Sequence, residues 1–271
     1  MLVLLPFICL AAVLSAAVCF SAGFSGWALA GMLALLFAAF FIAALALFLL
    51  VIGALSLLID MKKPVRKLNG FFCGFTKYVM GVVCALMRVR VTLAGGEMLP
   101  DGRWLLVSNH PSGFDIVTGL WALRRQDVAF IMKPDVLRIP AVRRFAVRLG
   151  CLAIDREDDR AALKTILTAA DMLKNDVTSF FIYPEGTRDY GDGLLPFRNG
   201  AFKVAQKAKA PVVVMATEGT ERIMKNFPLR RTNVTLRILE VFPAERVTAT
   251  KTTEIGREAR ACMERALGSF S

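Results

Sequence analysis

The sequence predicts an α/β domain, with a mostly parallel sheet and helices on both faces, preceded by an N-terminal two-helix membrane hairpin. No charged residue precedes Asp60, so all 34 Lys and Arg and all 22 Asp and Glu lie in residues 60–271. Beyond residue 88, short apolar runs alternate with segments of helical periodicity, the pattern of parallel strands joined by helices. We therefore divide the chain into a hydrophobic membrane hairpin (1–60), an interfacial linker or helix (61–88) and an α/β domain (89–271).

The opening of the chain predicts two membrane helices. Residues 1–20 and 27–59 are apolar runs separated by small residues, and a spanning helix needs about 20 residues. Nothing basic precedes the first run, which disfavours a signal peptide. Basic residues follow the second run, so we expect the soluble domain on the cytoplasmic face of the cytoplasmic (inner) membrane. A hairpin that only dips into the bilayer is the alternative, because the first run is short and contains Pro6.

The net charge of +12 and the six cysteines narrow the functional class. Strong basicity indicates an anionic partner, and beside a membrane segment the lipid surface is the simplest one. No basic run interleaved with aromatic residues indicates nucleic-acid binding. The single histidine and the absence of a C-x-x-C pair disfavour a metal site, and predict reduced, mostly buried thiols. The G-x-x-x-x-G-K and G-x-S-x-G patterns are absent, which disfavours nucleoside triphosphatases and serine hydrolases of those types.

The elements of the α/β domain follow from alternation and periodicity. Expected strands are residues 89–93, 104–108, 129–132, 179–183, 211–215 and 234–238. Expected helices are residues 69–87, 115–123, 136–149, 201–209 and 252–267, together with one that Asp158 or Asp159 caps and that runs through Leu173. The helix over 136–149 is basic and amphipathic, and we expect it to rest on lipid headgroups.

The single histidine lies in Asn-His110-Pro-Ser-Gly-Phe-Asp115, directly after an expected strand. A carboxylate near a lone imidazole can hold one ring tautomer and support the imidazolium, which prepares a general base for a hydroxyl. The structural alternative makes Asp115 a helix N-cap and His110 a polar loop residue. A second polar motif after another expected strand favours the general base, because ligands of parallel sheets bind beyond the carboxyl ends of strands.

That second motif is Tyr-Pro-Glu185-Gly186-Thr187-Arg188. The planar guanidinium of Arg188 suits a phosphate, although for this residue taken alone a surface pair with Asp189 is the better account. Glu185 can orient a substrate or pair with a neighbouring Arg, and Gly186 lets the backbone turn close to a ligand.

Three further cations are candidates for the same anion. Arg156 ends Gly150-Cys-Leu-Ala-Ile-Asp-Arg156 and could instead pair with Asp155. Lys133 follows the strand over 129–132 and is a weaker candidate, and Arg198 is an outside one. Together these motifs predict an enzyme that acts on an anionic, hydroxyl-bearing substrate.

The motifs resemble those of the glycerolipid acyltransferases, in particular the bacterial 1-acylglycerol-3-phosphate acyltransferases. His110 and Asp115 are similar to the H-x-x-x-x-D motif of that family, and residues 150–156 to its second motif. Residues 183–188 resemble the third motif, F-P-E-G-T-R, with Tyr in place of Phe, and residues 211–214 the loosely defined fourth. The resemblance covers residues 89–241, and departs at Met215-Ala216-Thr217, where the family often continues with a Pro.

The resemblance implies transfer of a fatty acyl group from acyl-CoA or acyl-carrier protein to the free hydroxyl of a lysophospholipid. Lysophosphatidic acid, giving phosphatidic acid, is the first candidate acceptor. His110 would take the hydroxyl proton and Asp115 would orient His110. The substrate-binding residues would be Arg188, Arg156, Glu185, Gly186, Thr187 and Lys133. Backbone N–H groups near Asp115 would stabilise the oxyanion.

A thioester needs no activating metal, so we expect no cofactor, and membrane lipids as partners rather than nucleic acid. Two alternatives stay open. One is acylation of another lysolipid, such as lyso-ornithine lipid. The other is a non-catalytic, membrane-anchored protein that binds lipid or acyl-carrier protein.

Overall fold

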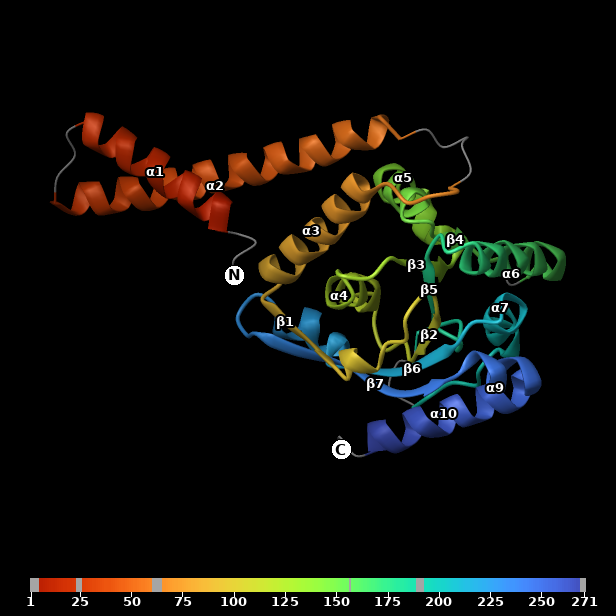
Figure 1. The fold of residues 1–271 in the computed structure, drawn as a ribbon. Helices are drawn as coiled ribbons and strands as arrows, with labels where there is room; N and C mark the ends of the chain where they lie inside the picture. The colour runs from red at the N-terminus through yellow and green to blue at the C-terminus, as the bar shows by residue number, and fades with distance from the viewer. Residues whose placement is uncertain (1–4, 23–25, 60–64, 156, 189–192, 269–271) are drawn as a thin grey trace. The chain divides into compact units, whose positions relative to one another are not determined.

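The computed structural model describes residues 5–22, 26–59, 65–155, 157–188 and 193–268 (Figure 1). The chain divides into two compact units, Met1–Asp60 and Met61–Ser271.

The first unit contains two apolar helices, α1 (Leu5–Ser21) and α2 (Gly26–Leu57), as the sequence predicts. They pack against each other, with the rings of Phe7 and Phe48 edge to face at 5.3 Å. Both helices are apolar around their whole circumference, which is typical of helices in lipid. By length and composition α2 is able to cross a membrane, whereas α1 has only 17 residues. A fully spanning hairpin therefore stays a prediction.

The second unit is built on one seven-stranded sheet of order β1-β7-β6-β2-β5-β3-β4. Neighbouring strands are parallel except β6 and β7, so the predicted mostly parallel sheet is confirmed. The antiparallel pair was not predicted; it forms because the chain folds back after β6 without a long crossover helix. The strands are β1 (Val89–Ala94), β2 (Leu105–Ser108), β3 (Val128–Met132), β4 (Leu152–Ala153), β5 (Ser179–Ile182), β6 (Val212–Glu218) and β7 (Thr232–Phe242).

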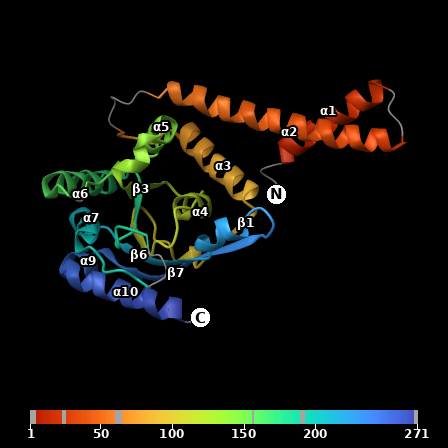
Figure 2. The ribbon, with the colours of Figure 1, turned by 180° about the vertical axis from the view of Figure 1, so that it is seen from behind.

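Helices cover both faces of this sheet, as predicted (Figures 1 and 2). Helices α3 and α4 lie on one face, and α7, α9 and α10 on the other. The core between the layers is strongly aromatic, with Trp104, Phe130, Phe180, Phe181, Phe202 and Phe242 fully buried. The helices are α3 (Gly70–Leu86), α4 (Asp115–Ala122), α5 (Pro140–Arg148), α6 (Asp159–Lys174), α7 (Lys203–Ala208), α8 (Ile223–Asn226), α9 (Ala244–Ala249) and α10 (Thr252–Gly268).

Two predicted helices are each divided in the structure. The segment over 136–149 forms a 3-10 turn, η3 (Pro134–Arg138), and then α5. The division falls at Pro140, which has no N–H to continue a helix and is suited to the first position of a new one. The segment over 201–209 divides likewise into η4 (Asn199–Phe202) and α7. The predicted cap of α6 is confirmed, since the Asp158 carboxylate accepts the N–H groups of Arg160 and Ala161.

The six cysteines are all free thiols, and all except Cys9 are buried. Burial raises the pKa of Cys151 to about 12, so this thiol stays protonated and unreactive near neutral pH. The prediction that the cysteines are reduced and mostly buried is confirmed.

Candidate active site

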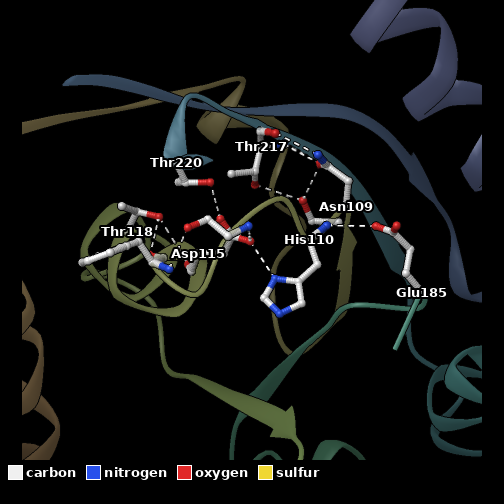
Figure 3. Close-up of polar contacts among 10 residues, drawn as sticks. Asn109, His110, Asp115, Thr118, Glu185, Thr217 and Thr220 are labelled. Atoms are coloured by element: carbon white, nitrogen blue, oxygen red, sulfur yellow. Dashed lines mark hydrogen bonds and ion pairs between the residues drawn. The ribbon is translucent and has the colours of Figure 1, made fainter. Parts of the chain in front are cut away.

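The two polar motifs meet at one edge of the sheet. Strands β2 and β5 are adjacent and parallel, so their carboxyl ends lie together. His110 follows β2 and Glu185 follows β5, and the His110 N–H donates a hydrogen bond of 2.9 Å to Glu185 Oε1 (Figure 3). Residues 75 positions apart in the sequence therefore share one rim, as expected from the parallel strands.

His110 and Asp115 form a close pair. The imidazole Nδ1 lies 2.6 Å from Asp115 Oδ2 (Figure 3). That oxygen also accepts the Ser112 N–H at 2.9 Å, and the other carboxylate oxygen accepts the Thr220 hydroxyl. Because an ionised carboxylate can only accept, Nδ1 carries the proton and the Nε2 lone pair is left as the base. Asp115 is almost fully buried, whereas the His110 side chain retains 16% exposure at the surface of the cavity described below.

Asp115 is the first residue of α4 and not its N-cap, which is Phe114. Its carboxylate nevertheless accepts the backbone N–H of Ser112 in the preceding loop. One side chain thus organises the loop and also holds the imidazole, so the alternative in which Asp115 is a helix N-cap and His110 only a polar loop residue is wrong.

Asn109 fixes the strand end that carries His110. Its side-chain amide donates to the Thr217 carbonyl at 2.9 Å and accepts the Thr217 N–H at 2.7 Å. Ser108 adds a hydroxyl contact of 3.0 Å to the Thr217 side chain. All three side chains are buried. This network joins the ends of β2 and β6 and restricts the backbone on which the imidazole is mounted.

Thr220 reaches Asp115 because the chain turns sharply at Gly219. Gly219 has φ +92°, and a Cβ there would lie 2.4 Å from the Asn233 carbonyl oxygen. Only glycine fits both the conformation and the close approach. From the sequence, Thr217 is named only in the departure at Met215-Ala216-Thr217, and Thr220 is not singled out; both lie more than 100 residues from His110 and Asp115.

Tyr183 stacks on the imidazole. The two ring centroids lie 4.1 Å apart and the planes differ by 10°. Burial, together with the negative charge of Asp115, raises the Tyr183 pKa well above its usual value, so the phenol stays neutral. Its buried hydroxyl has no hydrogen-bond partner within the described part of the chain. In the sequence, Tyr183 stands out only as a departure from the family motif, and no local pattern predicts its contact with His110.

Glu185 joins two loops at the rim. Besides the His110 N–H, its carboxylate accepts the Leu195 N–H at 3.0 Å, and the side chain is buried. These bonds go to backbone groups, so Glu185 shapes the site through the positions of neighbouring loops. The prediction that it binds substrate stays a prediction.

A cavity of about 380 Å³ opens beside His110. One part of its wall is apolar and comes from α4 and β3, whereas another part carries Lys133 and Arg188. The Arg188 guanidinium lies over Gly113 in the loop between His110 and Asp115, 3.4 Å from where a Cβ would stand. Neither cation has an ion pair with a described residue. The lining residues are His110, Gly113, Ile116, Phe130, Ile131, Met132, Lys133, Asp135, Tyr183, Gly186, Thr187 and Arg188.

A second cavity of about 540 Å³ shares Lys133, Gly186 and Thr187 with the first, and also has Glu185 and Arg198 in its wall. The structure thus brings together most of the residues singled out in the sequence. Arg156 lies outside the described residues, as does Asp189, the alternative partner considered for Arg188.

Residues 90–218, which hold this site apart from Thr220, match the family model described as Acyltransferase. Over 172 residues the chain is 31% identical to the 1-acyl-sn-glycerol-3-phosphate acyltransferase of Salmonella typhimurium, covering 62% of this chain and 69% of that protein. The chain belongs to the acyltransferase family. This acyltransferase is also 27% identical, over 214 residues, to the 1-acyl-sn-glycerol-3-phosphate acyltransferase of Saccharomyces cerevisiae, covering 69% of this chain and 70% of that one.

A solved structure supports the fold of this acyltransferase. The crystal structure of the 1-acyl-sn-glycerophosphate (LPA) acyltransferase PlsC from Thermotoga maritima superposes with a TM-score of 0.60 at 24% identity. The match covers 85% of this chain and 92% of that one. The α/β architecture is therefore that of a known acyltransferase.

Proposed function

We propose that this acyltransferase moves a fatty acyl group from acyl-CoA or acyl-carrier protein to the free hydroxyl of lysophosphatidic acid, giving phosphatidic acid for phospholipid synthesis. The observation that carries the proposal is the His110–Asp115 pair in one cavity with Lys133 and Arg188, two cations that form no ion pair with any residue the structure describes. A base beside fixed positive charge suits an acceptor that has both a hydroxyl and a phosphate. Relatives in bacteria and yeast carry the corresponding name.

In the proposed reaction, His110 Nε2 removes the proton of the acceptor hydroxyl as its oxygen attacks the thioester carbonyl. Asp115 stabilises the imidazolium that forms, since its carboxylate already lies 2.6 Å from Nδ1. The tetrahedral intermediate then collapses, the carbon–sulfur bond breaks, and the leaving thiolate takes the proton from the imidazolium. Backbone N–H groups at the start of α4 would stabilise the oxyanion, and Gly113, which lines the cavity, makes no described hydrogen bond through its N–H.

Charge and apolar surface divide the cavity between the two parts of a lipid substrate. Arg188 and Lys133 would hold the acceptor phosphate, with Arg156 as a third candidate cation. Gly186 and Thr187 line the same cavity. The apolar wall from Ile116 and Phe130 would accommodate acyl-chain carbons. We propose that the reaction needs no cofactor, because a thioester is already an activated acyl donor.

We also propose that the enzyme acts at the cytoplasmic membrane, with the α/β domain on the cytoplasmic face. The apolar helix α2 supports membrane association. The basic residues that follow it, Arg66 and Lys67 among them, support the cytoplasmic orientation. The lysolipid acceptor and the two-chain product both partition into that bilayer.

Acyl transfer from radiolabelled donor to a panel of lysolipids tests the proposal, using membranes that contain the wild type or His110→Ala. We expect label in phosphatidic acid with the wild type only. Label in another acylated lipid would keep the chemistry and change the acceptor. If neither acyl-CoA nor acyl-carrier protein gives label that depends on His110, the non-catalytic binding protein becomes the better account.

A further inference from the structure

Helices α3 and α5 carry an apolar surface that continues from the core to solvent. Phe71 and Phe75 of α3 stack at 6.2 Å, and Phe75 contacts Phe145 of α5 at 5.8 Å. Phe145 is buried, but Val142, one turn before it, is 40% exposed, and Ile139 is 59% exposed. Phe71, at the other end of this row of apolar side chains, is 61% exposed. Large apolar side chains gathered in this way indicate a surface that contacts a partner or a membrane.

Basic residues surround this surface and acidic ones are scarce. The sequence has no Asp or Glu from Met61 to Gly96 or from Val136 to Ile154. Arg66, Lys67 and Arg143 are exposed and form no ion pair with any residue the structure describes. Arg138 is also exposed, and pairs with Asp135 at 3.0 Å. We call Phe71, Ile139, Val142, Arg66, Lys67 and Arg143 the α3–α5 face.

One end of the α3–α5 face, at Ile139, lies close in sequence to residues that line the cavity beside His110. Lys133 and Asp135, at the start of η3, line that cavity, and Ile139 directly follows η3. Leu68 packs at Gly150, just after α5, which holds the segment with Arg66 and Lys67 beside the same helix. Figures 1 and 2 both show α3 and α5 side by side.

We propose that the α3–α5 face docks on an anionic phospholipid bilayer, with its apolar tips in the interface and its basic side chains on headgroup phosphates. Exposed apolar residues combined with exposed cations fit this occupant, since each contributes separately to interfacial binding. An acidic protein would pair with the cations but would bury the apolar side chains less completely. The inference rests on the proposed function in one respect: docking would place the cavity entrance where a lysolipid acceptor resides.

Site-specific photocrosslinking in the full-length protein tests the docking without relying on turnover. The photoreactive residue p-benzoylphenylalanine replaces Phe71 or Val142, and the protein is reconstituted in phosphatidylglycerol-rich or pure phosphatidylcholine vesicles. The matched control position is Arg257, which is 78% exposed on α10, on the other face of the sheet. We expect lipid adducts at positions 71 and 142, stronger in the anionic vesicles, and few at position 257.

Charge removal sharpens the test. Arg143→Gln should lower the anionic-lipid labelling at position 142 about fivefold, and adding Arg66→Gln and Lys67→Gln should lower it further. Arg257→Gln should leave it unchanged. Turnover of a detergent-dispersed lysolipid by the charge variants should stay at the wild-type level, because these residues lie outside the cavity lining.

Three results would overturn the docking proposal. The first is lipid labelling at positions 71 and 142 no higher than at 257. The second is crosslinking to added acyl-carrier protein in place of lipid, which would assign the face to an acidic carrier. The third is crosslinking to residues 1–60 of the same chain, which would make it an internal contact. Strong lipid labelling without any acyl transfer would instead retain the docking surface and refute the proposed function.

Discussion

The two sides of the cavity differ in how completely their side chains are held. On the base side, His110 is bonded through Nδ1 and its backbone N–H, stacked on Tyr183, and backed by the buried Asp115. On the cation side, Lys133 and Arg188 are exposed and have no described ion-pair partner. A base must be oriented before the substrate arrives, because its direction determines the rate. A phosphate-binding cation can gain its partner from the substrate itself, so it needs less support in the free enzyme.

The largest effect should come from removing the base. His110→Ala should lower kcat by about 10²–10⁴-fold, the range typical of general acid–base catalysis. The melting temperature should change little, because the imidazole is a partly exposed group at the cavity wall. Single-turnover acyl transfer and a thermal melt check the two expectations. Activity near the wild-type level would assign the proton transfer to another group.

Asp115→Asn should lower kcat by about 10²–10³-fold while leaving acceptor KM near its wild-type value. The amide keeps the size of the side chain but cannot hold His110 in the tautomer that leaves Nε2 free. It also leaves the Thr220 hydroxyl or the Ser112 N–H with a poorer acceptor. Thr220→Val is the matched control, since it removes one support of the carboxylate and keeps the charge. We expect a smaller loss of kcat for Thr220→Val. Equal losses of kcat would indicate that both variants act by disturbing the fold.

The cation side should respond through binding. Arg188→Ala should raise KM for a phosphate-bearing acceptor about 10–100-fold, because a charge-assisted hydrogen bond contributes about 1.5–3 kcal/mol. KM for the acyl donor should change little, and Arg188→Lys should recover only part of the loss. Arg257→Ala, at an exposed position on α10, serves as the control. Equal increases in KM for both substrates would make Arg188 a structural residue.

The support of the base side also depends on one backbone position. Gly219→Ala should destabilise the fold by about 1–3 kcal/mol, since it adds a positive-φ cost to a 2.4 Å clash with the Asn233 carbonyl. Gly102→Ala is the matched control: its φ is +76°, but a Cβ there meets nothing within 4 Å. Urea unfolding of the two variants separates the clash from the conformational strain. A similar loss of unfolding free energy in both variants would show that the turn at Gly219 relaxes enough to relieve the clash.

The sequence alone predicted some of the residues on each side of the cavity and not others. His110 and Glu185 could be placed on one rim because both follow buried strands of a parallel sheet, a regularity readable from apolar runs. Thr217 and Thr220 could not, because their contacts depend on the register of β6 beside β2 and on the turn at Gly219. Such contacts leave no local pattern in one sequence.

The division of the helix predicted over 136–149 does have a local signal in the sequence. Pro140 marks the start of α5, and a proline inside a helical pattern commonly ends one helix and begins the next. The antiparallel pairing of β7 had no such signal, because the alternation of buried and exposed residues along this strand is the same in either direction. Alternating strands and helices thus predicted the layers, but not the direction of every strand.

The smallest effect should come from Tyr183→Phe, which separates ring stacking from the hydroxyl. Phe keeps the aromatic face at 4.1 Å from the imidazole, so kcat should stay near the wild-type value. The buried hydroxyl has no partner among the described groups, so its removal should stabilise the fold by about 1 kcal/mol at neutral pH.

The stability gained by Tyr183→Phe should increase at high pH. The Tyr183 pKa is raised in the folded state, so above about pH 10 the unfolded chain loses a proton that the folded chain keeps. Wild-type stability therefore falls with rising pH in that range through this group, and the variant lacks this contribution. The stability difference between Tyr183→Phe and wild type, measured by urea unfolding from pH 7 to 11, should widen above pH 10. A variant less stable than wild type at neutral pH would show that the hydroxyl has a bonding partner, and that Tyr183 supports the base through more than its ring.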